Sequence, residues 1–231
     1  MSSSTHLRGP VRSALVAGVL MGGVLSGCTP KVSDLDDPRV PDGPVDINVA
    51  EVELVRLKAS AGMLDCPTTD DPSEEQYTPM PQEPLPNVVL PCLGGGRDVD
   101  LAQLRGPAII NVWASNCEPC REELPILQQV HEQADTTDLI VLGIDYRDYF
   151  PGAALRLLSE SGVTFPSVAD VNGVTTADLQ VVALPQTVFV NRAGSVVAVE
   201  RREMRSYKMV SGLVDQHLGI ELPPPPVDEE P

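Results

Sequence analysis

The sequence is poor in aromatic residues, in histidine and in positive charge. Of its 231 residues 3% are aromatic and three are histidine, and 33 acidic residues outnumber 16 basic ones, which gives a formal net charge of −17. Proteins that bind nucleic acid need clustered Lys and Arg to neutralise phosphates, so this balance argues against nucleic acid as a partner. The chain also has no glycine-rich phosphate loop, no Ser-His-Asp signature and no internal repeat, so nucleotide-dependent and triad-type chemistry are not indicated.

Proline, in contrast, is abundant. Most of the 23 prolines lie in three segments, at residues 36–44, 67–86 and 223–231. Such segments cannot bury enough apolar surface to become ordered. The composition therefore divides the chain after its first 27 residues into four parts. We predict a flexible tether at 28–45 and an N-terminal extension, made of a helix and a proline-rich loop, at 46–85. A folded domain follows at 86–222, and a disordered tail at 223–231.

A basic and then apolar stretch opens the chain. Arg8 and Arg12 precede an apolar run of small residues at 14–27, which is shorter than the roughly 20 residues that span a bilayer. We predict a signal peptide over residues 1–27. The run ends in LSGC, where Leu, two small residues and Cys28 resemble the lipobox of bacterial lipoproteins. That resemblance implies a lipid anchor at Cys28 on the extracytoplasmic face of the bacterial cell membrane; an ordinary secretory signal is the alternative.

Export changes what the remaining cysteines can do. Disulfides persist outside the cytoplasm, and an even number of four cysteines remains once Cys28 is assigned to the anchor. Cys117 and Cys120 form a C-x-x-C motif, which leaves Cys66 and Cys92 as single residues. We expect Cys66 and Cys92 to form a structural disulfide that ties the N-terminal extension to the first strand. A second redox pair that relays electrons to Cys117 is the alternative.

Apolar runs alternate with helical patterns along the chain. Continuous apolar runs predict strands that are buried on both faces at 108–113 and 139–145. Further strand patterns lie at 87–93 and in a hairpin of 186–191 with 195–203. Helical spacing of apolar residues predicts helices at 46–63, 120–134, 151–162, 174–182 and 206–218. The alternation indicates an α/β domain with a mixed sheet.

The C-x-x-C motif follows a predicted buried strand and opens a predicted helix. Cys117 is then expected at the helix N-terminus, where unpaired N–H groups and the helix dipole lower a thiol pKa from about 8.5 to about 3.5–7.5. In such a pair the exposed first cysteine attacks and the second, Cys120, resolves the mixed disulfide. Pro119 fits the first helical turn, where its missing N–H has no partner to lose.

Two other interpretations of the motif are weaker. A zinc site needs a second pair of Cys or His ligands at suitable spacing, which this chain lacks. An inert disulfide staple is possible chemically, but a C-x-x-C loop is too short to constrain much of the unfolded chain. A catalytic dithiol without a metal is therefore the favoured interpretation.

The segment NVWASNCEPCREELP resembles the active site of the thioredoxin superfamily, in particular its membrane-anchored TlpA/ResA branch, and the likeness continues through LIVLGIDYRD, FPSVAD and ALPQTVFVNRAGSVV. It covers about residues 86–220. The resemblance implies a thioredoxin-like fold, a central mixed sheet flanked by helices, and thiol-disulfide oxidoreductase activity without a metal or organic cofactor. It also implies that Pro185 is the cis-proline that faces the dithiol and, with Leu184, Trp113 and Pro119, binds substrate. Trp113 packs near the site in the family; a core residue is the alternative.

Two positions depart from the family pattern. Asn116 stands where the family usually has an aromatic residue before the first cysteine. Asn111 stands where thioredoxin has a buried aspartate. ResA-like proteins also lack that aspartate and carry a glutamate after the motif, which matches Glu123, one helical turn from Cys120. The resemblance implies that Glu123 handles the proton of Cys120; a solvated helix residue, as we expect for Glu122, is the alternative.

Together these features predict a monomeric, lipid-anchored, extracytoplasmic thiol-disulfide oxidoreductase that exchanges disulfides with proteins. The resemblance suggests a membrane thiol carrier of the CcdA/DsbD type as electron partner and apocytochrome c maturation as one substrate class. The alternatives are a peroxiredoxin-like thiol peroxidase and a non-catalytic binding lipoprotein on the same fold. The motif does not set the direction of electron flow, because the reduction potential depends on thiolate stability.

Overall fold

The computed structural model describes residues 43–69, 83–134 and 139–224. The predicted signal peptide, Cys28 with its predicted lipid anchor, and most of the predicted tether and tail lie outside these residues. The described residues from 43 onward belong to one compact unit, so the described part of the N-terminal extension packs with the main domain. Within these residues, no helix combines the length and the apolar character that a membrane crossing needs.

Helices and strands alternate along most of the described chain. In chain order the elements are α1 (Val52–Ser60), β1 (Val89–Leu90), β2 (Val99–Asp100), the 3-10 helix η1 (Leu101–Gln103), β3 (Ala108–Trp113), α2 (Glu118–Gln133), β4 (Ile140–Tyr146), α3 (Pro151–Glu160), β5 (Ser167–Asp170), β6 (Gln186–Val190), β7 (Val196–Glu200) and α4 (Tyr207–Leu218).

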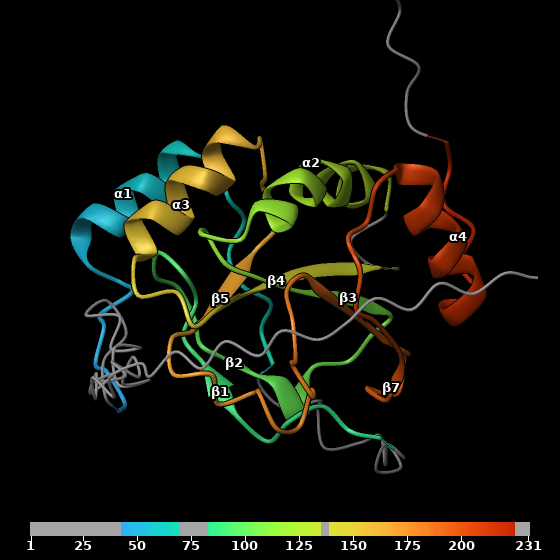
Figure 1. Cartoon of the computed structure of the whole chain (residues 1–231), viewed down its shortest axis with the longest axis horizontal. Coiled ribbons are helices and arrows are strands. Elements are labelled where there is room, and N and C mark those ends of the chain that lie inside the picture. The colour runs from blue at the N-terminus through green and yellow to red at the C-terminus, as the bar shows by residue number, and fades with distance from the viewer. Residues whose placement is uncertain (1–42, 70–82, 135–138, 225–231) are drawn as a thin grey trace, which may run out of the picture. The chain divides into compact units, whose positions relative to one another are not determined.

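Five of the strands form the central sheet, in the order β5-β4-β3-β6-β7 (Figure 1). Strands β3, β4 and β5 run parallel, while β6 pairs antiparallel with both β3 and β7. Strands β1 and β2 form a separate antiparallel pair. The mixed sheet and the hairpin of β6 and β7 that the sequence predicts are confirmed.

Different elements pack against the two faces of the sheet. All four helices contribute to the core on one face, where Ile109 and Trp113 of β3 point. The β1–β2 pair, η1 and the loop before β6 cover the opposite face (Figure 1). Ile110 and Val112 of β3 belong to the core on that face. Because side chains alternate along a strand, Asn111 also points to the helical face, beneath α2.

Helix α1 is shorter than the predicted helix at 46–63, and its buried side does not carry Val52 and Val55, two of the valines whose spacing predicted the helix. Leu54 and Lys58 face the core, whereas Val52 and Val55 are 68% and 45% exposed. The spacing of apolar residues predicts the wrong buried face, because a lysine is not counted among the residues expected in the core. Lys58 nevertheless lies inside, since its ammonium finds hydrogen-bond partners there, and a buried charge is tolerated when it is paired.

The predicted helix at 174–182 is wrong, because this segment folds into successive turns. The carboxylate of Asp170 accepts hydrogen bonds from the backbone N–H groups of Val174, at 2.7 Å, and Thr175, at 3.0 Å. Such side-chain bonds offer the backbone an alternative to helical pairing. Gln180 then adopts a left-handed conformation with a φ of 49°, which a helix cannot contain.

The remaining predicted elements are present, with their ends shifted by a few residues. Strand β5 was not predicted separately, because four residues are too few for a pattern. Strand β5 is fixed in the sheet by its parallel pairing with β4, a contact between segments that the sequence pattern does not show. A cis bond between Gly106 and Pro107, just before β3, was not predicted either.

The hydroxyl of Ser206 caps helix α4 by accepting a hydrogen bond from the backbone N–H of Met209 at 3.2 Å. We expect Ser206→Ala to lower the free energy of unfolding by about 1 kcal/mol, because the N–H of Met209 loses its side-chain acceptor and keeps only its 3.1 Å bond to the carbonyl oxygen of residue 206. Ser211→Ala, inside the same helix, is the matched control and should leave stability unchanged or slightly raised. Urea unfolding of both variants measures this, and equal effects would show that the cap contributes nothing.

Candidate active site

The two cysteines of the C-x-x-C motif lie where β3 passes into α2. Cys117 is the N-cap residue of α2, with extended backbone angles of −95° and 108°, and its sulfur accepts a hydrogen bond from the backbone N–H of Cys120 at 3.3 Å. Cys117 is half-buried and Cys120 is fully buried. A disulfide joins them. The first cysteine is thus the one that an external sulfur can reach.

The end of the helix provides the electrostatics of this site. Helix α2 has 16 residues, and its unpaired N–H groups and positive dipole end point toward the sulfur of Cys117. Once the disulfide is reduced, the same N–H that now bonds to Cys117 favours its thiolate over its thiol. The position predicted for Cys117 is therefore confirmed, and its role as nucleophile stays a prediction.

Glu123 is fully buried, one helical turn after Cys120. Its carboxylate accepts hydrogen bonds from the side-chain amide of Asn111 at 2.6 Å and from the backbone N–H of Met204 at 2.9 Å. Burial raises the pKa of Glu123 to about 7, the charge of Glu203 adds to this rise, and the two hydrogen bonds oppose it. The alternative of a solvated glutamate is wrong for this position.

Asn111 replaces the buried aspartate of thioredoxin and also forms part of the hydrogen-bond network of Glu123. Its amide nitrogen donates to Glu123, while its oxygen Oδ1 has no hydrogen-bond partner among the described residues. Rotation of the amide by half a turn exchanges these two atoms, so that Oδ1 can accept a hydrogen bond from the O–H of a neutral Glu123. The pair can therefore satisfy either protonation state of the carboxyl group, which the sequence did not reveal.

The other predicted site residues differ in exposure. The bond between Leu184 and Pro185 is cis, as predicted, and Leu184 is partly buried against the core. Pro119 lies in the first turn of α2 and is also partly buried. Trp113 is fully buried, in the same core cluster as Cys120, so a direct contact of Trp113 with substrate is contradicted.

Two aspartates near the end of β4, Asp145 among its last paired residues and Asp148 in the loop that follows, were not predicted as part of the site. Asp148 accepts hydrogen bonds from the backbone N–H of Ser115, at 2.7 Å, and of Phe150, at 2.9 Å, and so fixes the loop that leads into Cys117. Burial, with the nearby charge of Asp148, holds the pKa of Asp145 well above its usual value. The polar residues directly after a buried strand were the available signal for this cluster.

Among the described residues, no group of three or more Cys, His, Asp or Glu side chains is placed to hold a metal ion.

Comparison with known proteins gives consistent matches. A model of the AhpC/TSA family matches residues 81–199. The chain is 32% identical over 157 residues to the thiol:disulfide interchange protein DsbE of Pseudomonas aeruginosa, which covers 65% of this chain and 77% of that protein. It is 30% identical over 117 residues to the thiol-disulfide oxidoreductase ResA of Bacillus subtilis, and this aligned region covers 49% of this chain and 63% of that protein.

A solved structure agrees with these matches. The secreted thiol-disulfide isomerase of Corynebacterium glutamicum superimposes with a TM-score of 0.52 and 30% identity over 68% of this chain and 97% of that chain. The chain spans 62% and 63% of the lengths of two of the curated relatives that it matches.

A parallel strand, β3, delivers C-x-x-C to a helix N-terminus, and its antiparallel neighbour β6 begins directly after a cis-proline. Together with the matches above, this defines the class: a thioredoxin-fold thiol-disulfide oxidoreductase. Within that class the chain belongs to the AhpC/TSA family. The predicted fold and the resemblance to ResA-type oxidoreductases are confirmed.

We expect Glu123→Gln to change both the stability profile and the chemistry. The pKa of Glu123 is raised from 4.5 to about 7, so the ionised form is disfavoured in the folded chain. This destabilisation develops as pH rises from about 4.5 to 7 and persists above, and can reach about 3 kcal/mol. Glu123→Gln should therefore be more stable, relative to the parent protein, at pH 8 than at pH 4. Urea unfolding at both pH values measures the difference.

The same variant should lower the pKa of the Cys120 thiol, because a negative charge nearby disfavours a second one. Disulfide exchange should also slow by about 10²-fold or more, because Cys120 loses its proton acceptor. Alkylation rates against pH and exchange kinetics report these effects. Glu122→Gln, on the exposed side of α2, is the matched control, and equal behaviour of the two variants would assign the proton to another group.

Proposed function

We propose that the protein exchanges disulfides with exported proteins through Cys117 and Cys120. The main observation in support is the difference in exposure between Cys117, which is half-buried at the α2 N-terminus, and Cys120, which is fully buried. A substrate sulfur can meet the first cysteine, and the second is protected from every partner except Cys117. This asymmetry is what an attacking and resolving pair requires.

The reductive direction proceeds in two exchanges. The Cys117 thiolate attacks one sulfur of a substrate disulfide, so that a mixed disulfide forms and the other substrate sulfur leaves as a thiolate. Glu123 then accepts the proton of Cys120, whose thiolate attacks Cys117 and releases the remaining substrate sulfur. Two electrons pass to the substrate, and the protein ends with the Cys117–Cys120 disulfide that the structure contains. The oxidative direction is the reverse.

Glu123 times the second exchange. While it is ionised, its charge holds Cys120 as a thiol, so the mixed disulfide on Cys117 persists until the substrate is properly placed. A pKa of about 7 makes Glu123 a base that can accept this proton near neutral pH. Asn111 then satisfies the neutral carboxyl group by turning its free oxygen Oδ1 toward it.

The proposed setting is the extracytoplasmic face of the membrane, where a lipid at Cys28 would hold the chain. Support comes from the LSGC sequence that ends the apolar leader. Relatives named as thiol-disulfide oxidoreductases and interchange proteins support exchange with protein thiols. A membrane thiol carrier of the CcdA/DsbD type as electron donor, apocytochrome c as substrate class and a monomeric state follow from the family resemblance, and they belong to this proposal.

A thiol peroxidase is the second candidate, because the matching family is described as AhpC/TSA. Such an enzyme attacks a peroxide with one cysteine. Both reactions need Cys117, so loss of that residue alone does not separate them. The two functions are distinguished by comparing the rate at which hydrogen peroxide oxidises the reduced protein with the rate at which a protein disulfide oxidises it.

We expect the reduced protein to reduce insulin and Cys117→Ser to be inactive, because the attacking sulfur is lost. Cys120→Ser should accumulate a mixed disulfide between Cys117 and the substrate, because no resolving thiol remains. Insulin turbidity and mass spectrometry measure these outcomes. Faster oxidation by hydrogen peroxide than by insulin would favour the peroxidase, and no reaction with either would favour a binding protein.

We expect Cys28→Ala to move the protein from the membrane fraction to the soluble exported fraction, since a lipid supplies much of the affinity for the bilayer. Fractionation of cells expressing the parent protein and the variant measures the distribution. Cys66→Ala is the control for the general loss of a cysteine. Retention of Cys28→Ala in the membrane, at the level of the parent protein, would contradict the anchor.

A further inference from the structure

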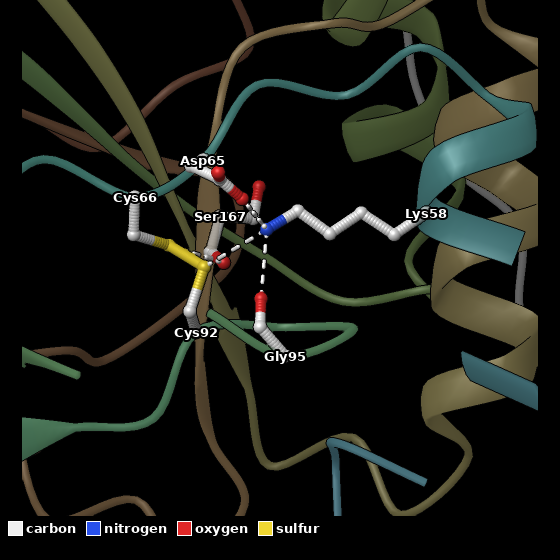
Figure 2. Close-up of polar contacts among 6 residues, drawn as sticks. All are labelled: Lys58, Asp65, Cys66, Cys92, Gly95 and Ser167. Atoms are coloured by element: carbon white, nitrogen blue, oxygen red, sulfur yellow. Dashed lines mark hydrogen bonds and ion pairs between the residues drawn. A yellow bond between two sulfur atoms is a disulfide. The ribbon is translucent and has the colours of Figure 1, made fainter. Parts of the chain in front are cut away.

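A second disulfide joins Cys66 and Cys92, as the sequence predicts. Both residues are buried, and a lysine lies against one of their sulfurs. Lys58 extends from α1, and its Nζ donates to the sulfur of Cys92 at 3.4 Å, to the carbonyl oxygen of Gly95 at 2.7 Å and to the carboxylate of Asp65 at 3.0 Å (Figure 2). An inert staple does not need a buried cation at its sulfur.

The positive charge at this sulfur is poorly compensated. An ammonium has three N–H donors, and those of Lys58 are directed at Cys92, Gly95 and Asp65. The neighbouring anion is Asp65, but its side chain is 89% exposed whereas that of Lys58 is 7% exposed. Solvent screens the carboxylate far more than the ammonium, so the net field at Cys92 favours a thiolate.

The two sulfurs have different neighbours. The sulfur of Cys66 lies 3.4 Å from the carbonyl oxygen of Ser167, although a disulfide sulfur has no proton to donate. After reduction, a Cys66 thiol can donate to that oxygen, and a Cys92 thiolate can accept from Lys58. The site therefore already contains a suitable partner for each sulfur of the reduced pair.

Three consecutive glycines let the chain lie this close to Lys58. A Cβ on Gly94 would lie 2.7 Å from the Cβ of Lys58, and a Cβ on Gly96 would lie 3.4 Å from both Nζ of Lys58 and the sulfur of Cys92. Gly94, Gly95 and Gly96 all have positive φ angles. The glycine run is thus more than a turn: it shapes the pocket around the ammonium and the sulfur.

We propose that Cys66–Cys92 is a second redox-active disulfide, polarised by Lys58 so that Cys66 is attacked and Cys92 leaves. Cys66 is only 5% exposed, so the segment that carries it has to open locally before an external dithiol can enter. A thiolate of that dithiol then attacks the sulfur of Cys66, the S–S bond breaks, and its electron pair goes to Cys92 as a thiolate beside Lys58. The second thiolate of the reductant then attacks the mixed disulfide and releases Cys66, which takes up a proton. The reductant becomes a disulfide, and the protein gains two electrons.

The electrons of this pair do not pass directly to Cys117. Cys92 lies beside Val168 of β5, and β5, β4 and β3 are successive neighbours in the sheet. Three strand spacings of about 4.8 Å place Cys92 about 14 Å from the line of β3, which leads to Cys117. Direct exchange needs sulfurs in contact, so the second pair reacts with an external dithiol, independently of the Cys117–Cys120 reaction.

The test uses the full chain with Cys28→Ala, Cys117→Ser and Cys120→Ser, which leaves Cys66 and Cys92 as the only cysteines. The oxidised protein is treated with 2-mercaptoethanol, quenched with acid and mapped by mass spectrometry. We expect the mercaptoethanol adduct on Cys66 to exceed that on Cys92 by about tenfold or more, because the thiolate of lower pKa leaves faster.

Lys58→Met in the same background should remove this preference and slow reduction by about tenfold, because it keeps a long side chain but loses the charge. Lys208→Met, an exposed position on α4, is the control for loss of a lysine and should match the parent protein. Equal adducts on both cysteines in the parent protein, or an unchanged preference in Lys58→Met, would overturn the proposal.

A second measurement needs no Lys58 variant, in case that variant does not fold. Thiolate absorbance at 240 nm of the reduced pair, titrated against pH in the folded Lys58 protein, should show a first thiolate with a pKa below about 7.5. A first pKa at or above about 8.5 would mean that the ammonium does not stabilise Cys92, and the disulfide would then be a structural staple.

Discussion

A buried carboxylate connects the parts of this molecule that have to stay together. Glu123 projects from α2, accepts a hydrogen bond from Asn111 of β3 and accepts another from the backbone of Met204, just before α4. Removing its charge from water is unfavourable, and the two bonds recover part of that cost. The group that holds α2 over the sheet is therefore also a weak acid one turn from the resolving cysteine.

The chain contains two disulfides with different electrostatic environments. At Cys117 the thiolate is favoured by the N-terminus of α2, a field that any residue at that backbone position would experience. At Cys92 it is favoured by one side chain, Lys58, which a single substitution can remove. The first arrangement belongs to the fold, whereas the second depends on the N-terminal extension and on the glycine loop around its lysine.

The sequence predicts the features that depend on local pattern or on a short motif. The strand of β3, the helix that opens with the motif, the pairing of Cys66 with Cys92 and the cis bond before Pro185 were all expected and are all present. The motif and the strand are local, and the family resemblance supplied the proline.

The missed features depend on contacts between distant segments. The burial of Lys58 requires Gly95 and Asp65, which no helical periodicity can include. The bond of Asn111 to Glu123 joins a strand to a helix across the core. The turns at 174–182 form because Asp170 competes with helical hydrogen bonds, an effect that apolar spacing does not register.

The disulfide of Cys66 and Cys92 also makes a closed ring of the backbone between them, with a sequence separation of 26. A protease that cuts one peptide bond within this ring leaves both fragments covalently joined as long as the sulfurs are oxidised. The fragment that carries α1 and the predicted anchor at Cys28 would then stay attached to the fragment that carries the catalytic dithiol. Reduction of the same pair would leave the packing of α1 against α3 and the rest of the core as the remaining attachment.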